Sequence, residues 1–327
     1  MFFYRYLNLC MLTITDFSKP QNPYPQDVLE ILLSERRSKN TQKAYLGDLR
    51  IFFSFIAADE PLTAALVARF LQLKREQAVI LVLRFKAHCL EKKLAEATLN
   101  RRLAAIRALV SMGQTVGACS YNLDDIKGEK VQSYRDTTGV EVSTFTQCLA
   151  KCDLNTPKGK RDYALLHLLW SNGLRRGEVA SLKIKDLDLD SKRLRIYGKG
   201  LGTQALWIDL SQATTSAIER WLLTRELLTE QSPIFSSLHA GYKDYPLTTT
   251  GIYKIVEQYF KLVTSKHISP HRIRHSAITA ALDLYNGDVR KVQKFSRHKS
   301  IETLMIYDDN RQNSQKQISR SLSDLLG

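Results

Sequence analysis

The sequence of 327 residues contains no stretch of 18 apolar residues, the length that a membrane-spanning helix requires. Its five cysteines are an odd number and include no C-x-x-C pair, so reduced thiols in a cytosol are expected rather than a disulfide framework. Internal repeats and low-complexity segments are also missing. These absences favour a cytoplasmic protein, and its 44% of hydrophobic residues suffices for two domains with separate cores.

Positive charge is what the chain has in excess. Its 48 Lys and Arg residues against 33 Asp and Glu residues give a net charge of +15. A charge of this size favours a polyanionic partner, either nucleic acid or an anionic membrane surface. Residues 34–50 hold five basic and two acidic residues, and residues 84–107 hold seven basic residues and two glutamates. Solvated lysines around a plain helical bundle would produce the same pattern.

Hydrophobic spacing divides the chain into four parts: a leader (1–24), a helical domain (25–118), a linker (119–141) and a second domain (142–327). The second domain is expected to be mostly helical, with a small antiparallel β-sheet and a C-terminal tail. The leader has no basic region and no clear cleavage site, so it is not interpreted as a signal peptide, and Met11 is an alternative start. The first long helix is expected to have Asn40 or Thr41 as its N-cap.

A cluster of cationic and titratable residues, HRIRH, follows Ser269-Pro270, which predicts a helix N-terminus. His271, Arg274 and His275 then share one helix face. Two histidines at this spacing can bind zinc, but an arginine lies between them and no general-base glutamate accompanies them. Guanidinium and imidazole groups at a helix N-terminus favour an anion site, because the unpaired N–H groups already attract negative charge. A histidine cap and an arginine paired to a surface acid form the structural alternative.

Four further residues with reactive or cationic side chains lie at predicted turns or in short helices. Arg175 follows Gly173, which is expected to end a helix, and Lys199 lies in the turn of a predicted hairpin. His298 lies in a short interhelical turn, and Tyr307 follows nine residues later. Taken singly, each has a structural alternative, such as a surface salt bridge for Arg175 or a core aromatic for Tyr307.

Together these residues resemble the sequence boxes of the tyrosine recombinases, the family of phage integrases and Xer-type resolvases. The matching segments are NGLRRGE at 172–178, GKG at 198–200, HRIRH at 271–275 and SRHKSIETLMIY at 296–307. The segments SKNTQKAYLGDLRIFFSF and TLNRRLAAIRAL resemble helices of the family's SAM-like core-binding domain. Two positions depart from the pattern, because Arg297 stands where the last box has glycine and Leu304 where it has a second threonine.

The resemblance implies six catalytic residues, two supporting residues and five DNA contacts: Arg175, Lys199, His271, Arg274, His298 and Tyr307; Glu178 and His275; Thr41, Lys43, Arg101, Arg102 and Arg272. In the implied reaction the tyrosine cuts a DNA strand, stores the bond as a 3′-phosphotyrosine and rejoins it without ATP, cofactor or metal. The implied partner is double-stranded DNA with inverted-repeat half-sites. The resemblance also implies that the chain is a monomer in solution and forms a homo- or hetero-tetramer on this DNA. The implied location is the nucleoid, with no membrane involved.

Three other functions are weighed against this one. A nicking-closing topoisomerase would use related chemistry without a defined site, and a silent DNA-binding protein would lack catalysis although all six reacting residues are present. A basic structural or membrane-surface protein would have no need of the four boxes. Within the family, the motifs suit chromosome-dimer resolution as well as integration or excision of a mobile element. The apolar tail at 315–327 is expected to dock on a neighbouring protomer or to fold back on its own domain.

Overall fold

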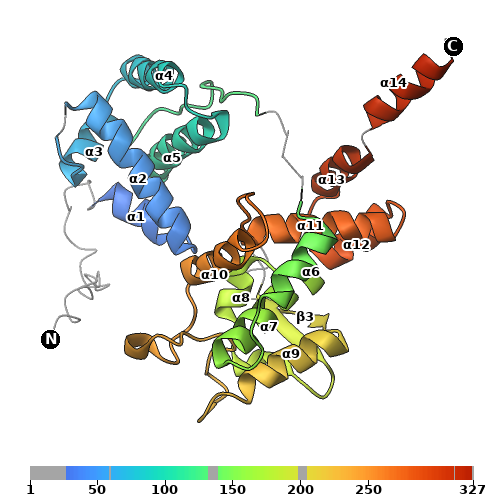
Figure 1. Ribbon diagram of the computed structural model, residues 1–327. Helices are drawn as coiled ribbons and strands as arrows, with labels where there is room; N and C mark the ends of the chain where they lie inside the picture. The colour runs from blue at the N-terminus through green and yellow to red at the C-terminus, as the bar shows by residue number, and fades with distance from the viewer. Residues whose placement is uncertain (1–26, 59, 132–138, 198–204, 313, 326–327) are drawn as a thin grey trace. The chain divides into compact units, whose positions relative to one another are not determined.

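The computed structural model describes residues 27–58, 60–131, 139–197, 205–312 and 314–325. The chain divides into two compact units, Met1–Gln132 and Ser133–Gly327, which we call the N-terminal and C-terminal units. Figure 1 draws the first in blue to blue-green and the second in green to red. Within the described ranges, no helix is both long and apolar enough to cross a membrane.

Helices build the described part of the N-terminal unit: α1 (Val28–Ser34), α2 (Lys39–Ile56), α3 (Ala64–Leu71), α4 (Arg75–Glu91) and α5 (Glu96–Thr115). Four buried phenylalanine rings from α2, α3 and α4 meet edge to face in its core, with centroids 5.2 to 5.7 Å apart. The predicted N-cap of α2 is wrong by two or three residues. Ser38 is the cap, because its hydroxyl accepts the N–H of Thr41 at 3.4 Å.

The first part of the predicted linker belongs to the N-terminal core. Tyr121, Leu123 and Ile126 are buried there, and the hydroxyl of Tyr121 donates to the carbonyl of Phe70 at 2.7 Å. These apolar residues have no helical spacing because they lie outside any helix, in a segment that turns between Leu123 and Ile126, which is why periodicity did not identify them. The boundary between the two units, after Gln132, lies further along the same predicted linker.

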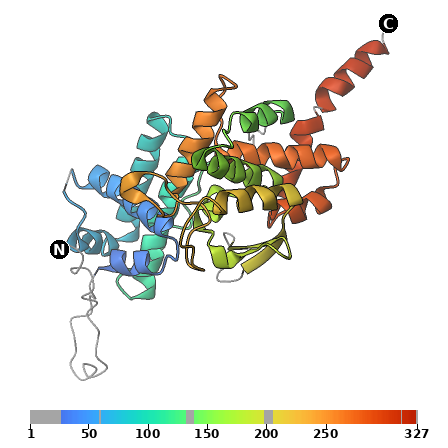
Figure 2. The same ribbon diagram turned by 60° about the horizontal axis from the view of Figure 1, so that its bottom comes forward.

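The C-terminal unit is mostly helical: α6 (Val142–Ala150), α7 (Pro157–Ser171), α8 (Arg176–Ser181), η2 (Ile184–Asp186), α9 (Gln212–Leu222), η3 (Ala240–Tyr242), α10 (Thr249–Lys261), α11 (Pro270–Leu284), α12 (Val289–Ser296), α13 (Glu302–Gln312) and α14 (Ser314–Asp324). One antiparallel sheet joins β1 (Leu187–Asp188), β2 (Arg193–Tyr197) and β3 (Ala205–Asp209) in that order. Both ribbon views place the sheet beside α9 (Figures 1 and 2). The predicted fold class is confirmed.

Two hydrophobic cores lie inside the C-terminal unit. The larger gathers side chains from α6 to α11 and from the sheet, and includes the fully buried Trp221. The smaller lies between α11, α12 and α13 and consists of five buried side chains: Ile278, Leu282, Val292, Leu304 and Tyr307. Leu304 is fully buried, so an apolar side chain suits the position where the family pattern has threonine.

Candidate active site

The turn between α7 and α8 positions Arg175. Gly173 ends α7 with φ at +52°, and a Cβ at this position would lie 3.1 Å from the ring of Phe295, so both backbone conformation and space favour glycine. Arg175 then begins α8 as its N-cap, and Glu178 reaches back to it. The carboxylate accepts the backbone N–H of Arg175 at 2.9 Å and its guanidinium at 2.8 Å.

Helix α11 carries Arg274 into the interior. Ser269 caps the helix by accepting the N–H of Arg272 at 3.3 Å, and Pro270 occupies its first turn, as predicted. The Arg274 side chain is fully buried and donates to the backbone carbonyls of Gly173 and Ser296. Burial, together with the neighbouring guanidinium groups of Arg175 and Arg297, lowers the pKa of Arg274 to about 9.

A third guanidinium, at a position where the last box of the family pattern has glycine, completes the cluster. Arg297 donates to the carbonyls of Asn172 and Gly173, both at 3.0 Å, and lies 3.4 Å from the carboxylate of Glu178. Burial lowers the pKa of Arg297, and the Glu178 carboxylate partly opposes this effect. The sequence signal for this residue was its departure from glycine in the last box, although that departure alone does not reveal its partners.

Three imidazole rings and the tyrosine form the other half of the site. The ring of Tyr307 stacks on His275 with centroids 4.9 Å apart, and lies 6.1 Å from the ring of His298. His271 meets His275 edge to face at 4.2 Å. His298 also lies near Arg274, with 3.4 Å between Nε2 and Nη2. Arginines and imidazoles from different boxes therefore form one continuous cluster.

A cleft of about 610 Å³ opens on one side of this cluster. Its lining includes Arg175, His271 and Arg274 together with three residues that sequence reasoning did not select, Arg176, Tyr197 and Tyr253. Tyr307 is 2% exposed and belongs to the small core instead of the cleft wall. Lys199 lies outside the described residues.

The electrostatics of the described site favour an anion. Three guanidinium groups, on Arg175, Arg274 and Arg297, lie near one another, and the carboxylate of Glu178 pairs with the first and the last of them. Arg175 is about one-third exposed and lines the cleft, so part of this charge is open to a ligand. Among the described residues, no group of three or more His, Cys, Asp or Glu side chains could hold a metal ion.

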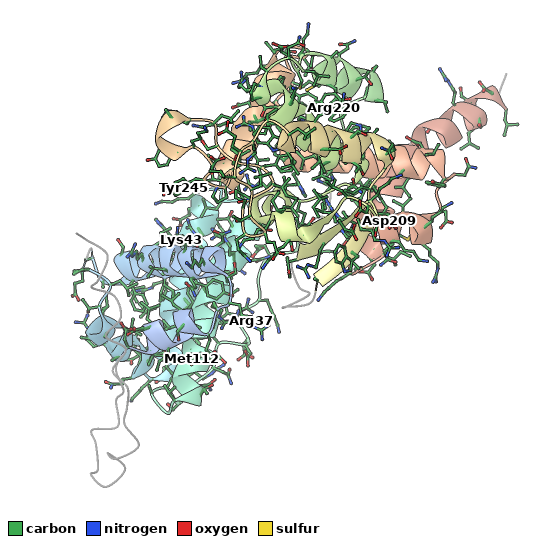
Figure 3. The ribbon with its side chains drawn as sticks, turned by 90° about the horizontal axis from the view of Figure 1, so that it is seen from below. Arg37, Lys43, Met112, Asp209, Arg220 and Tyr245 are labelled. Atoms are coloured by element: carbon green, nitrogen blue, oxygen red, sulfur yellow. The ribbon has the colours of Figure 1, made fainter. Side chains whose placement is uncertain are left out.

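The predicted DNA-contacting residues of the N-terminal unit differ in exposure. Lys43 is exposed on α2, where Figure 3 labels it, and Thr41 is half-buried in the first turn of the same helix. On α5, Arg101 is half-exposed and pairs with Asp48 at 3.0 Å, whereas Arg102 is mostly buried and turned toward the same carboxylate. In the C-terminal unit, Arg272 is half-buried and donates to the carbonyl of His267 at 3.3 Å. DNA contacts by these five residues stay predictions.

Known proteins match both units. The phage integrase family matches residues 137–314, and the N-terminal SAM-like domain of phage integrases matches residues 27–112. A tyrosine recombinase of Synechococcus elongatus is 44% identical over 302 residues, which cover 92% of this chain and 94% of that protein. A second, from Synechocystis sp., is 45% identical over 303 residues, which cover 92% and 96%.

Solved structures share the fold. The XerH site-specific recombinase bound to its difH substrate has a TM-score of 0.58 at 22% identity, over 82% of this chain and 76% of that one. Together with the sequence matches to both units, the relatives establish the class of protein. The chain belongs to the phage integrase family and is a tyrosine-type site-specific DNA recombinase.

Proposed function

We propose that this enzyme cuts and rejoins double-stranded DNA through a covalent phosphotyrosine at Tyr307. The observation that carries the proposal is the convergence of Arg175, Arg274, His275 and Tyr307 on one cluster beside an open cleft. The solved XerH relative was captured on its DNA substrate, which supports DNA as the ligand here. The net charge of +15 suits the same partner.

In the proposed reaction, Oη of Tyr307 attacks the scissile phosphorus, a bond from oxygen to phosphorus forms, and the bond to the 5′ oxygen breaks. His271 accepts the tyrosine proton, because imidazole titrates near working pH. Lys199 donates a proton to the leaving 5′ oxygen. The DNA keeps its phosphodiester energy as a 3′-phosphotyrosine, so that rejoining needs no ATP.

The two box arginines hold the non-bridging oxygens of the phosphate as negative charge develops. A planar guanidinium offers paired N–H donors that match two oxygens, and Arg175 already faces the cleft. His298, which lies beside Arg274, donates a further hydrogen bond. Glu178 and His275 support this group by holding Arg175 and by packing against Tyr307. Two arginines and a lysine supply the positive charge, so the reaction as proposed uses no metal ion.

Tyr307 has to move before it can react. Its ring is stacked on His275 inside a core of only five buried side chains, whereas the phosphate cleft is lined by other residues. We infer that α13 shifts when DNA is bound, because a small core holds a helix with little free energy and allows local opening. We further propose that the reaction takes place in a tetramer of chains on paired inverted-repeat half-sites.

A trapping assay tests the proposal. A target duplex is first selected from a random pool by binding. It is then nicked just beyond the cleaved bond, so that the short fragment released with a free 5′ hydroxyl diffuses away and cannot be rejoined. Wild type is expected to give a covalent protein–DNA adduct that survives denaturation, and Tyr307→Phe is expected to give none. Absence of an adduct with wild type would overturn the proposal. Strand exchange between two copies of the site then separates a recombinase from a nicking-closing enzyme.

A further inference from the structure

Arg297 has a backbone conformation that side-chain-bearing residues rarely adopt. It is the C-cap of α12, with φ at +57° and ψ at +35°, in the left-handed region that glycine occupies without strain. Strained residues persist where the surrounding structure holds them, and they cluster at functional sites. The family pattern places glycine here. This chain therefore has a large cationic side chain at a position where the backbone conformation favours glycine.

The side chain of Arg297 joins two turns that are remote in sequence. One terminal nitrogen donates to the carbonyls of Asn172 at 3.0 Å and Phe295 at 2.8 Å. The other donates to the carbonyl of Gly173 at 3.0 Å and lies 3.4 Å from Glu178. Asn172 and Gly173 precede Arg175, and Phe295 lies just before His298. The guanidinium therefore links the turn of the first box to the turn of the last.

Arg297 shares a partner with each of the two box arginines. The carbonyl of Gly173 accepts hydrogen bonds from both Arg274 and Arg297. The carboxylate of Glu178 holds both Arg175 and Arg297. Without Arg297, the Gly173 carbonyl and the Glu178 carboxylate would each lose one hydrogen-bond or ion-pair partner. The side chains of both box arginines would then be held less firmly in position.

We propose that Arg297 is a positioning residue for strand cleavage, which locks the α7–α8 turn to the α12–α13 turn and so sets the separation of Arg175, Arg274 and His298 before DNA binds. This inference rests on the proposed function. Arg297 is not expected to contact the phosphate itself, because Arg175 and Arg274 are among the described residues that line the cleft and Arg297 is not. It differs in this respect from Arg175, which lines the cleft.

The experiment compares the adduct-forming rate of wild type with those of Arg297→Gly and Arg297→Lys. Glycine relieves the backbone conformation, so the melting temperature is expected to stay near that of wild type. Cleavage is expected to fall about a hundredfold, because small errors in position have effects of this size on preorganised sites. Affinity for the duplex is expected to be unchanged. Arg297→Lys keeps the charge but loses the planar fork, so it is expected to remain slow even if the glycine variant folds poorly.

Lys192 supplies the matched control. It is an exposed basic residue with φ at +50° in the turn between β1 and β2, so Lys192→Gly makes a similar change at an equivalent backbone position away from the cluster. This variant is expected to cleave at the wild-type rate. Arg297→Gly cleaving at the wild-type rate, in an enzyme whose wild type forms the adduct, would overturn the inference and leave the proposed function intact. Failure of wild type to form any adduct would instead overturn the proposed function.

A neutral substrate separates positioning from a general structural role. Replacing one non-bridging oxygen of the scissile phosphate with a methyl group removes its negative charge, so accurate placement of the arginines matters less. On this methylphosphonate, the difference in cleavage rate between wild type and Arg297→Gly is expected to shrink to about tenfold or less. The difference between wild type and an Arg175→Ala variant is expected to shrink in the same way. An undiminished difference together with a lowered melting temperature would show a structural role only and would overturn the inference.

Discussion

Each unit of the molecule has a buried carboxylate surrounded by arginines, and the two clusters differ in their balance of charge. In the N-terminal unit, Asp48 on α2 is 3% exposed, with Arg101 at 3.0 Å and Arg102 at 3.9 Å. In the C-terminal unit, Glu178 is equally buried, with Arg175 at 2.8 Å and Arg297 at 3.4 Å. Both carboxylates thus hold two arginines.

The difference is a third arginine in the C-terminal unit. Arg274 lies fully buried beside Arg175 and Arg297 and donates to backbone carbonyls, which carry no charge. Burial and the two neighbouring cations lower its pKa to about 9, whereas burial of Asp48 raises the pKa of that carboxyl against the effect of its two arginines. Arginines that pair with a buried carboxylate stabilise the fold around it. An additional arginine that donates to neutral carbonyls and lines a cleft forms part of a site that an anion can complete.

The largest expected effect lies in the C-terminal cluster. Arg175→Ala and Arg274→Ala each remove a donor that stabilises the charged transition state, a loss of about 3 kcal/mol or more. We expect cleavage to fall at least a hundredfold while duplex binding is largely kept, because binding energy is spread over many phosphate contacts. Adduct formation and gel-shift titration measure the two quantities. A variant that cleaves at the wild-type rate would contradict the proposed phosphate contact.

The N-terminal cluster is expected to respond in stability and not in chemistry. Asp48→Ala leaves the mostly buried Arg102 without its carboxylate, which should lower the free energy of unfolding by about 2 kcal/mol. Denaturant titration of the full chain measures this change, with the exposed Asp124→Ala as the matched control. The cleavage rate of the folded fraction is expected to stay at the wild-type value. A large loss of cleavage rate in Asp48→Ala would contradict a purely structural role for the N-terminal cluster.

The C-terminal tail should affect neither cluster. Leu322 and Leu325 are exposed in the region of α14, which fits the expectation that the tail docks on another protomer. Truncation after Gln312 is expected to leave cleavage by single chains unchanged and to weaken assembly on paired sites about tenfold, roughly 1.4 kcal/mol. Analytical ultracentrifugation on DNA measures the assembly. Normal assembly of the truncated chain would favour a tail that folds back on its own unit.

The smallest effect tests the excess charge directly. Inorganic phosphate at millimolar concentration is expected to raise the melting temperature of wild type by about 1 to 2 °C, because it binds only the folded cluster. Arg175→Ala should lose this response, and Asp48→Ala should keep it. The response should weaken as the pH rises past about 9, since Arg274 then loses its charge in the phosphate-free protein. An equal response in Arg175→Ala would place the anion elsewhere.

Local signals predicted the scaffold of the site well. Gly173 after α7 and Ser269-Pro270 at α11 both mark helix ends in the structure. Caps of this kind depend on hydrogen bonds between residues three or four positions apart, so the sequence contains them nearly in full. The N-cap of α2 was misplaced because Ser38, Asn40 and Thr41 are all capable caps and lie within four positions of each other.

Long-range partners were beyond such signals. Arg102 belongs to a basic segment that predicts a DNA contact, yet its side chain is turned toward Asp48. Tyr121, Leu123 and Ile126 resembled linker residues until their burial in the N-terminal core was known. In both cases the deciding contact comes from another element, and hydrophobic spacing within one segment carries no information about it.

The sequence by itself determined the class of this recombinase, because four boxes in fixed order specify reactive groups whatever their exact placement. The tertiary structure alone decided that Arg297 shares the Glu178 carboxylate with Arg175. It also decided that the ring of Tyr307 stacks on His275 and is buried in a small core. The physical reason is distance along the chain. The contact between Arg297 and Glu178 spans 119 residues, and the packing of α7 and α12 against α11 brings the two together.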